Sequence, residues 1–196
     1  MARPRRSDDT RQMLVEEGSA GFLANGYHGT GIKQVLDAVG VPKGSFYNYF
    51  DSKESFAQAV IDHYSLCIQR NLADALGPAA DPIEGLRVFF DRLIDDFVAA
   101  DYTGGCLIAN LGGELEGSET LRESLSGAFT AWRDGVAVAL REAQEQKLVR
   151  DDIDAAELAD LLVESWEGAV IRMKIERSIR PLRNCLRRLL DDYFLP

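Results

Sequence analysis

Residues 30–54 read TGIKQVLDAVGVPKGSFYNYFDSKE, and this stretch decides the fold. Apolar residues recur at helical spacing in its first half, at Ile32, Val35, Leu36 and Val39. Gly40 follows where a helix end favours a left-handed residue, and Pro42 suits the first position of a next helix because its missing N–H would have no intrahelical partner. Two helices joined by so short a turn predict a helix-turn-helix.

The second of these helices is very short, from about Pro42 to Phe50. Phe46 and Phe50 stand four residues apart and can hold one face against a core. The remaining faces carry groups that bind phosphates and base edges, namely Lys43, Gly44, Ser45, Tyr47, Asn48 and Tyr49. Tyrosines on a short helix can also be plain core or surface residues, but the density of polar groups favours a DNA-recognition helix.

The segment GVPKGSFYNYFDSKESF, preceded by GYHGTGIKQVLDAVG, resembles the DNA-binding domain of the TetR family of bacterial one-component repressors. The likeness covers about Phe22 to Phe56. It implies DNA contacts from Thr30, Lys43, Gly44, Ser45, Tyr47, Asn48, Tyr49 and Lys53. Three departures are Gly31, where relatives often place a second hydroxyl, Pro42, where a serine is common, and Gly18, where the first helix usually carries alanine. A glycine inside a helix costs up to ~1 kcal/mol relative to alanine.

The rest of the chain reads as helices, about nine in all, which predicts an all-α fold. Asp51 with Glu54 is expected to cap the helix that follows the motif, and Asp81 and Asp154 are expected to cap two later helices. The resemblance implies a three-helix DNA-binding domain over residues 1–52 and a helical ligand-binding and dimerisation bundle over 53–196.

A homodimer is expected because one short helix touches too few base pairs to select a site. The resemblance places the dimer interface on the last two helices, whose apolar stripes run from Leu158 to Met173 and from Leu182 to Phe194. The alternative, that these stripes only close the core of one monomer, stays open, since one stripe cannot face both ways.

Charge is unevenly distributed along the 196 residues, whose net charge is -10. Residues 1–53 hold seven Lys or Arg against six Asp or Glu, whereas residues 54–196 hold fifteen against twenty-six. The acidic charge thus belongs to the second domain, which suppresses indiscriminate DNA binding. Arg3, Arg5 and Arg6 form a basic arm that either binds phosphates or the minor groove, or is a solvated tail.

Composition and the cysteines predict a cytoplasmic protein without a cofactor. No apolar run is long enough to span a membrane, and the N-terminus lacks the apolar segment of a signal peptide. Cys67, Cys106 and Cys185 show no metal-type spacing, and an odd number of cysteines argues against a disulfide framework. We therefore expect reduced thiols and no metal site.

Two further segments, GGCLIANLGGELEGSETLRESL and WEGAVIRMKIERSIRPL, are similar to a branch of the family that includes the repressor of N-ethylmaleimide reductase and acrylate-responsive regulators. The resemblance implies a small-molecule inducer, with reactive electrophiles and small unsaturated acids as candidates. Cys106 is expected at a helix start, where the helix dipole favours a thiolate and thus a sensor role. A buried cysteine that merely packs as a small hydrophobe is the alternative.

Other residues are candidates for the inducer pocket because apolar walls with a few polar groups make small-ligand sites. They are Phe89, Phe90, Leu93, Tyr102, Asn110, Trp132, Trp166 and Arg172. Each can equally be a core residue, and Arg172 can instead pair with Glu167 or Glu176.

Two rival functions remain at this point. A cysteine-dependent enzyme would need Cys106 with His28 or His63, which are the only histidines, and neither a glycine-rich phosphate loop nor a metal-ligand cluster accompanies them. A helical ligand carrier with a vestigial DNA-binding domain is the second rival. Specific, salt-sensitive DNA binding separates a regulator from both.

Overall fold

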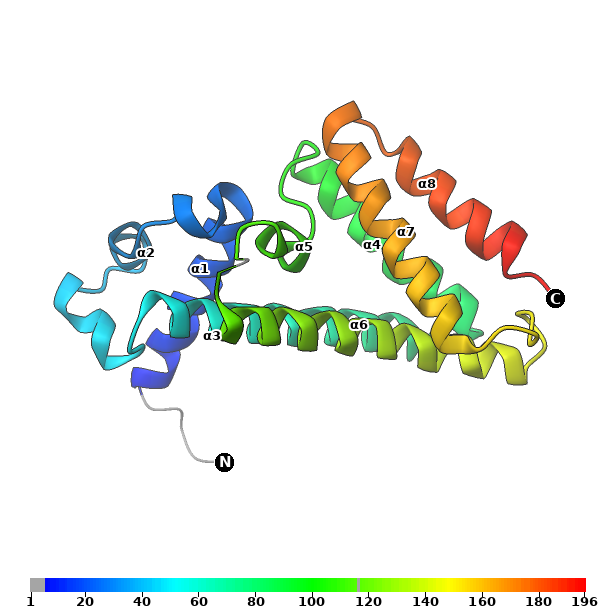
Figure 1. Cartoon of the computed structure of the whole chain (residues 1–196), viewed down its shortest axis with the longest axis horizontal. Coiled ribbons are helices and arrows are strands. Elements are labelled where there is room, and N and C mark those ends of the chain that lie inside the picture. Colours follow the sequence, from blue (N-terminus) through cyan, green and yellow to red (C-terminus); the bar gives the residue numbers. More distant parts are fainter. Residues whose placement is uncertain (1–5, 116) are drawn as a thin grey trace. The chain divides into compact units, whose positions relative to one another are not determined.

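The computed structural model describes residues 6–115 and 117–196, with side chains from Asp8 onward. The basic arm lies outside this part, since neither the placement of Arg3 and Arg5 nor the side chain of Arg6 is described. The α-helices in Figure 1 are α1 (Arg6–Gly29), α2 (Ile32–Ala38), α3 (Lys53–Leu76), α4 (Pro82–Ala99), α5 (Leu107–Gly112), α6 (Glu119–Glu145), α7 (Ala155–Glu176) and α8 (Arg180–Leu186).

Two helical segments of other types, one 3₁₀ and one π, complete the list of helices. The 3₁₀ helix η1 covers Lys43–Asn48, and the π-helical segment η2 (Arg187–Tyr193) continues α8 without a break. The described residues contain no strand, and with α8 and η2 taken as one they form nine helices. The predicted all-α fold is confirmed.

The chain divides into two compact units. Unit 1 comprises residues 1–66 and 107–128, and unit 2 comprises residues 67–106 and 129–196. Both α3 and α6 therefore contribute residues to both units. The functional boundary expected between residues 52 and 53 stays a prediction, because these units group residues by packing and not by role.

Unit 1 holds the helix-turn-helix. Gly40 ends α2 with a φ of 69°, as the sequence predicts, and Val41 N donates to Leu36 O at 2.9 Å to close the turn. The expected second helix is shorter and tighter than an α-helix, since Ser45 N donates to Pro42 O at 2.8 Å in the 3₁₀ pattern. Gly26, with a φ of 71° and ψ of 176°, breaks α1 near its end.

The cap of α3 differs from the expected Asp51 and Glu54 pair, and that prediction is wrong. Ser52 and Ser55 cap the helix reciprocally, each backbone N–H donating to the hydroxyl of the other at 3.0 Å. Glu54 instead accepts a hydrogen bond from the hydroxyl of Ser118. Because Glu54 is bonded to Ser118, which is distant in the chain, it does not cap the helix, and α3 begins one residue later than expected.

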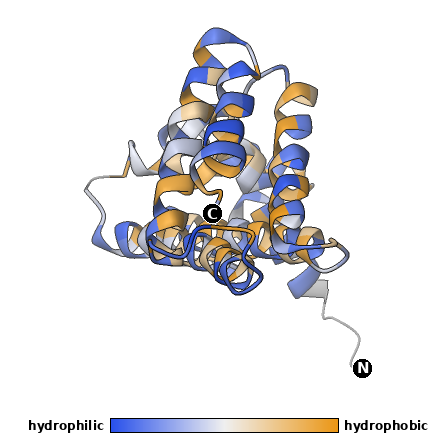
Figure 2. Ribbon diagram, turned by 90° about the vertical axis from the view of Figure 1, so that its right-hand side faces the viewer, coloured by the Kyte–Doolittle hydropathy of each residue, from blue (hydrophilic) through white to orange (hydrophobic). Residues whose placement is uncertain are grey.

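Unit 2 contains α4, α7 and α8, with parts of α3 and α6. Asp81 caps α4 by accepting from Glu84 N at 2.9 Å, and Asp154 caps α7 by accepting from Ala156 N at 2.8 Å, so both predicted caps are confirmed. Arg177 ends α7 in the left-handed region, and α8 then folds back beside α7 (Figure 1). Figure 2 shows apolar and polar residues on different faces of the helices.

The long helices do not resemble membrane spans. Among the described residues, no helix combines the length and the apolar composition that crossing a bilayer requires.

Candidate functional site

The segment η1 presents polar groups outward from an aromatic anchor. Phe46 and Phe50 are buried, whereas Tyr47 is 70% exposed. Lys43, Gly44 and Asn48 are also exposed, and Ser45 and Tyr49 are half-buried. The outward groups are those that the sequence predicts as DNA contacts, and their contact with DNA stays a prediction.

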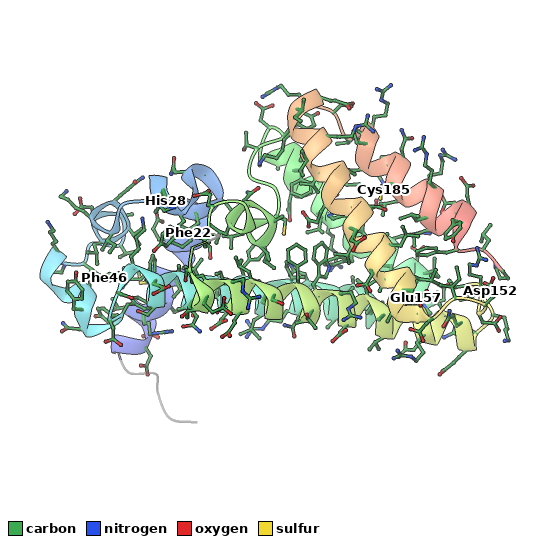
Figure 3. All side chains as sticks on the ribbon, in the orientation of Figure 1. Phe22, His28, Phe46, Asp152, Glu157 and Cys185 are labelled. Atoms are coloured by element: carbon green, nitrogen blue, oxygen red, sulfur yellow. The ribbon has the colours of Figure 1, made fainter. Side chains whose placement is uncertain are left out.

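Four phenylalanines fix η1 within unit 1 (Figure 3 labels two of them, Phe22 and Phe46). Phe56 of α3 lies at the centre, with ring centroids 5.8 Å from Phe22, 5.7 Å from Phe46 and 4.9 Å from Phe50. Such tilted and edge-to-face pairs add about 0.5–1.5 kcal/mol each beyond their buried area. A short 3₁₀ segment with little helical stability of its own is thereby held in one orientation.

Two glycines of the helix-turn-helix have open space around them. A Cβ added to Gly44 would meet no heavy atom within 4 Å, and the same holds for Gly31. Gly44 therefore has no packing reason to be glycine, which fits a need for close approach by another molecule. Gly31 is the N-cap of α2 and supplies no side-chain acceptor, so the absent hydroxyl leaves that helix start without a side-chain cap.

Two other predicted DNA contacts have their side chains bonded within unit 1. Thr30 is 1% exposed, and its hydroxyl donates to Gly26 O at 2.8 Å. The Lys53 ammonium donates to Tyr27 O at 2.5 Å and lies 4.5 Å from the centroid of the Tyr27 ring. Both side chains thus stabilise the turn between α1 and α2.

Glu114 is a residue of this region that the sequence analysis missed. Its Oε2 accepts a hydrogen bond from His28 N at 3.3 Å, across 86 positions of the chain. Burial lowers the pKa of Lys53, and the charge of Glu114 opposes that shift. The carboxylate therefore joins the segment after α5 to the turn that precedes α2, and no local sequence pattern signals such a contact.

Several of the predicted pocket residues form the aromatic core of unit 2. Phe89, Phe90, Trp132 and Trp166 are each at most 3% exposed. The ring of Phe90 lies 5.1 Å from Phe89 and 4.6 Å from Trp166, and Leu93 is half-buried one turn further along α4. These side chains pack closely, and their contact with a ligand stays a prediction.

The other predicted pocket residues are Tyr102, Asn110 and Arg172. Tyr102 is half-buried with a φ of 62°, and its ring lies 6.0 Å from the Arg177 guanidinium. Asn110 belongs to α5 in unit 1. Arg172 is exposed and bonds Glu176 through two nitrogens, at 2.9 and 2.6 Å, so the ion-pair alternative with Glu176 is confirmed.

Cys106 is buried beside a carboxyl group. It precedes α5, a helix of six residues, so the dipole expected to favour a thiolate is that of a very short helix. The thiol is 6% exposed and lies within hydrogen-bonding reach of Glu167 on α7. Burial raises the pKa of Glu167 to about 7, and the thiol partly opposes this shift.

Glu167 also lines a cavity that the sequence analysis did not identify. Neither of its carboxyl oxygens is accessible, and neither has a partner at full hydrogen-bond geometry. The cavity holds about 420 Å³ between α6 and α7 and is lined by Phe129, Thr130, Arg133, Asp160, Val163, Glu164 and Glu167. Glu167 follows the core residue Trp166. An acidic residue next to an apolar stripe was the only feature of the sequence that could have pointed to this buried carboxyl.

The apolar stripes proposed for dimerisation turn out to close the core of unit 2. Leu158, Leu162 and Trp166 on α7 are at most 1% exposed, and Leu182 on α8 is fully buried. The exposed apolar residues of α7 are Ile171 at 58% and Ile175 at 76%. Both lie on a different face from the buried stripe, and a groove of about 500 Å³ between α7 and α8 is lined in part by Gly168, Arg172 and Cys185 (Figure 3 labels Cys185).

Comparison with known proteins decides the family. Residues 14–60 match the family model of "Bacterial regulatory proteins, tetR family". Residues 82–189 match the family model of "Tetracyclin repressor-like, C-terminal domain". The chain belongs to the TetR family of bacterial transcriptional regulators. The predicted family is confirmed, and with it the role of the helix-turn-helix in a DNA-binding regulator.

Several TetR-family relatives match nearly end to end. The transcriptional repressor DhaR of Mycobacterium sp. (strain GP1) is 38% identical over 88% of this chain and 86% of its own. The transcriptional regulator AcuR of Cereibacter sphaeroides is 34% identical over 94% of this chain and 87% of its own. The crystal structure of reduced Escherichia coli NemR superposes with a TM-score of 0.86 at 28% identity, covering 93% of this chain and 96% of that one. The predicted branch is thereby confirmed.

Proposed function

We propose that the protein is a homodimeric repressor that binds a palindromic operator through η1 and leaves it when a reactive electrophile modifies Cys106. The observation that carries the DNA-binding half is the outward face of η1, where Tyr47 is 70% exposed above the buried Phe46. A side chain with so large an exposed aromatic surface and a hydroxyl gains most from contact with a partner. The relatives DhaR and NemR are named as repressors, which supports repression over activation.

Tyr47→Ala tests this half. Operator affinity, measured by fluorescence anisotropy on DNA from the native upstream region, should fall about tenfold or more, because a base or phosphate contact is worth about 1–3 kcal/mol. Helical content should not change, since the side chain is outside the core. Val98→Ala, which removes a 45% exposed apolar side chain on α4 of unit 2, is the control and should bind normally. Unaltered affinity in Tyr47→Ala would remove η1 from the interface.

The proposed response to an electrophilic inducer rests on the placement of Cys106 beside Glu167. The thiol shares a buried polar setting with a carboxyl whose oxygens lack other partners, which a cysteine acting only as a hydrophobe does not require. N-Ethylmaleimide should release the wild type from its operator. Cys106→Ser should bind DNA normally and resist release, whereas Cys185→Ser should still be released, and the reverse result would assign sensing to the other thiol.

A dimer through α7 and α8 is proposed because Ile171 and Ile175 leave apolar surface exposed beside a groove of about 500 Å³. Ile175→Asp should convert the protein to monomers in sedimentation velocity and weaken operator binding. Val138→Asp is the control, since Val138 is 51% exposed on α6. Dimers that persist in Ile175→Asp would place the interface elsewhere.

The same observations disfavour the rival functions. The side chain that interacts with Cys106 is the carboxyl of Glu167. The histidines have other neighbours: the ring centroid of His28 lies 5.1 Å from that of Tyr27, and Gln12 Nε2 lies 3.4 Å from His63 Nδ1. We propose no enzymatic activity and no cofactor. A protein whose partner is operator DNA acts in the cytoplasm, and specific, salt-sensitive binding in the titration above would exclude the ligand-carrier alternative.

A further inference from the structure

Most of the described cationic side chains of unit 1 are already bonded within the unit. Those with a partner are Lys33, Lys53 and Arg122. The other two, Arg11 and Lys43, are exposed and form no ion pair with any of the described residues. They are therefore the described cations of unit 1 that can bind a phosphate without first losing a partner.

Arg11 belongs to α1, but its charge lies close to the end of η1. Its guanidinium carbon is 5.0 Å from the centroid of the Phe50 ring, and Phe50 comes two residues after the end of η1. The Phe50 ring is itself fixed, since its centroid lies 5.5 Å from that of Phe46 and 4.9 Å from that of Phe56. A cation over an aromatic face is attracted by the negative charge of that face. The aromatic cluster that orients η1 therefore also positions the Arg11 charge.

The two available cations thus lie at the two ends of η1. Lys43 is its first residue, and the Phe50 ring that holds Arg11 follows its last residue, Asn48. Six 3₁₀ residues at ~2 Å each are roughly 10 Å long, which is close to the ~12 Å width of the major groove. Because phosphates border this groove on both sides, a segment seated in it brings both of its ends near phosphates. Contacts with phosphates fix the register and orientation of a DNA-binding element.

A hollow of about 280 Å³ beside Arg11 gives a phosphate room to reach the guanidinium. It is lined in part by Arg11, Asp51, Asp62 and Tyr49, which is one of the predicted DNA contacts. Burial raises the pKa of Asp62, and the charge of Arg11 opposes that shift, so these two side chains interact without forming an ion pair. Two acids beside one cation weaken the attraction of the hollow for distant phosphates. Arg11 therefore adds binding mainly when η1 is already seated in the groove.

We propose that Arg11 is a further DNA contact, which binds a backbone phosphate at the end of η1 opposite Lys43. The proposal rests on the proposed docking of η1 into operator DNA. A phosphate contact adds affinity on any sequence, because phosphates carry no base identity. Arg11 thus orients η1 in the groove and does not select the operator.

The salt dependence of binding separates a phosphate contact from a structural role. Fluorescence anisotropy of the full-length protein would be measured between about 50 and about 200 mM salt, on a fragment of the native upstream region and on a scrambled fragment of equal length. Each lost phosphate contact lowers the slope of log affinity against log salt by about 0.9, so Arg11→Met should lower it by about 2 in a dimer with two copies. At about 0.1 M salt the affinity for both fragments should fall roughly fivefold to tenfold per copy.

Three variants control for charge and folding. Arg11→Lys keeps the charge and should retain most of the salt slope. Arg122→Met removes the same charge from unit 1, but its guanidinium is already paired with Glu119, so the slope should not change. Asp62→Asn leaves Arg11 intact and removes a neighbouring negative charge, and should strengthen binding to both fragments about twofold to fivefold. This last variant keeps the proposal testable should Arg11→Met fold poorly, which circular dichroism would reveal.

Tyr47→Ala in the same titrations distinguishes the possible failures. If Tyr47→Ala weakens operator binding and Arg11→Met keeps the wild-type slope, Arg11 binds no phosphate and this proposal alone is wrong. If neither variant changes binding, η1 is not the interface and the proposed function fails as well. Equal loss of slope in Arg11→Lys and Arg11→Met, or binding by Asp62→Asn no stronger than that of the wild type, would also overturn the phosphate contact.

Discussion

A Cβ atom on Gly18 of α1 would overlap the ring of Phe56 on α3. The same atom would lie 2.9 Å from Cγ2 of Val60, which is also too close. Gly18 therefore permits the close approach of α1 and α3 in unit 1. A larger residue would favour the helix more but would not fit between them. Because Phe56 is also the centre of the cluster that holds η1, this contact bears on the DNA-binding surface.

Gly18→Ala should destabilise the protein despite the higher helix propensity of alanine. The gain of up to about 1 kcal/mol from propensity is outweighed by overpacking, which costs about 1–3 kcal/mol. Urea denaturation would measure the difference. Gly127→Ala on α6 is the matched control, since its Cβ would meet no atom within 4 Å, and it should be neutral or stabilising. A Gly18→Ala protein as stable as the wild type would contradict the packing argument.

Gly44→Ala should separate DNA binding from folding. The added methyl group meets nothing within 4 Å in the protein, so the unfolding free energy should change by less than about 1 kcal/mol. If the DNA backbone approaches this glycine, operator affinity should nevertheless fall about tenfold, in keeping with about 1.4 kcal/mol. Anisotropy titrations and thermal melts would be run beside Gly112→Ala, an equally open position on α5, where affinity should not change.

Glu114→Ala should loosen the turn between α1 and α2. The variant removes the acceptor of the His28 N–H, and an intramolecular hydrogen bond of this kind contributes about 0.5–1.5 kcal/mol. Hydrogen exchange should become faster in residues 26–30, with weaker operator binding as a consequence. Glu119→Ala, which removes an exposed acid at the start of α6, should leave exchange in this segment unchanged. Wild-type protection in Glu114→Ala would mean that the contact does not stabilise the turn.

The stability of the protein should depend on pH through Glu167. Burial raises the pKa of this carboxyl from 4.5 to about 7, so the folded state binds the proton more tightly than the unfolded state. The resulting stabilisation is fully present below pH 4.5 and is lost as the pH rises through 7. Glu167→Gln removes the charged form, and at pH 8 it should be more stable than the wild type by about 1–3 kcal/mol. Melting temperatures of the two proteins should converge towards pH 5, and parallel curves would disprove the assignment.

Local patterns in the sequence were sufficient for several helix ends and for the motif. Gly40, Asp81 and Asp154 act where they were expected, because a left-handed C-terminus or a side-chain N-cap involves residues only a few positions apart. The apolar spacing likewise predicted the helices, and the motif predicted the family. The capping pair of α3 was wrong because Ser118, distant in the chain, bonds Glu54 and leaves the cap to Ser52 and Ser55.

The regulatory side was less predictable from the same patterns. Aromatic residues suggested as pocket walls fill a core, and Arg172 pairs with Glu176 on the surface. An apolar stripe does not reveal whether it will meet another helix or a ligand, since both bury the same side chains. The carboxyl that adjoins Cys106 comes from Glu167, which is 61 positions later in the chain.

The sequence by itself determined the helices, several of their ends, the helix-turn-helix and the family, because these follow from interactions between near neighbours and from a dense local motif. Only the tertiary structure decided why residue 18 is glycine, that Glu114 bonds the turn before α2, and that Glu167 adjoins the Cys106 thiol. The physical reason is that packing distance, burial and charge at these positions are set by partners that the fold brings together from distant parts of the chain.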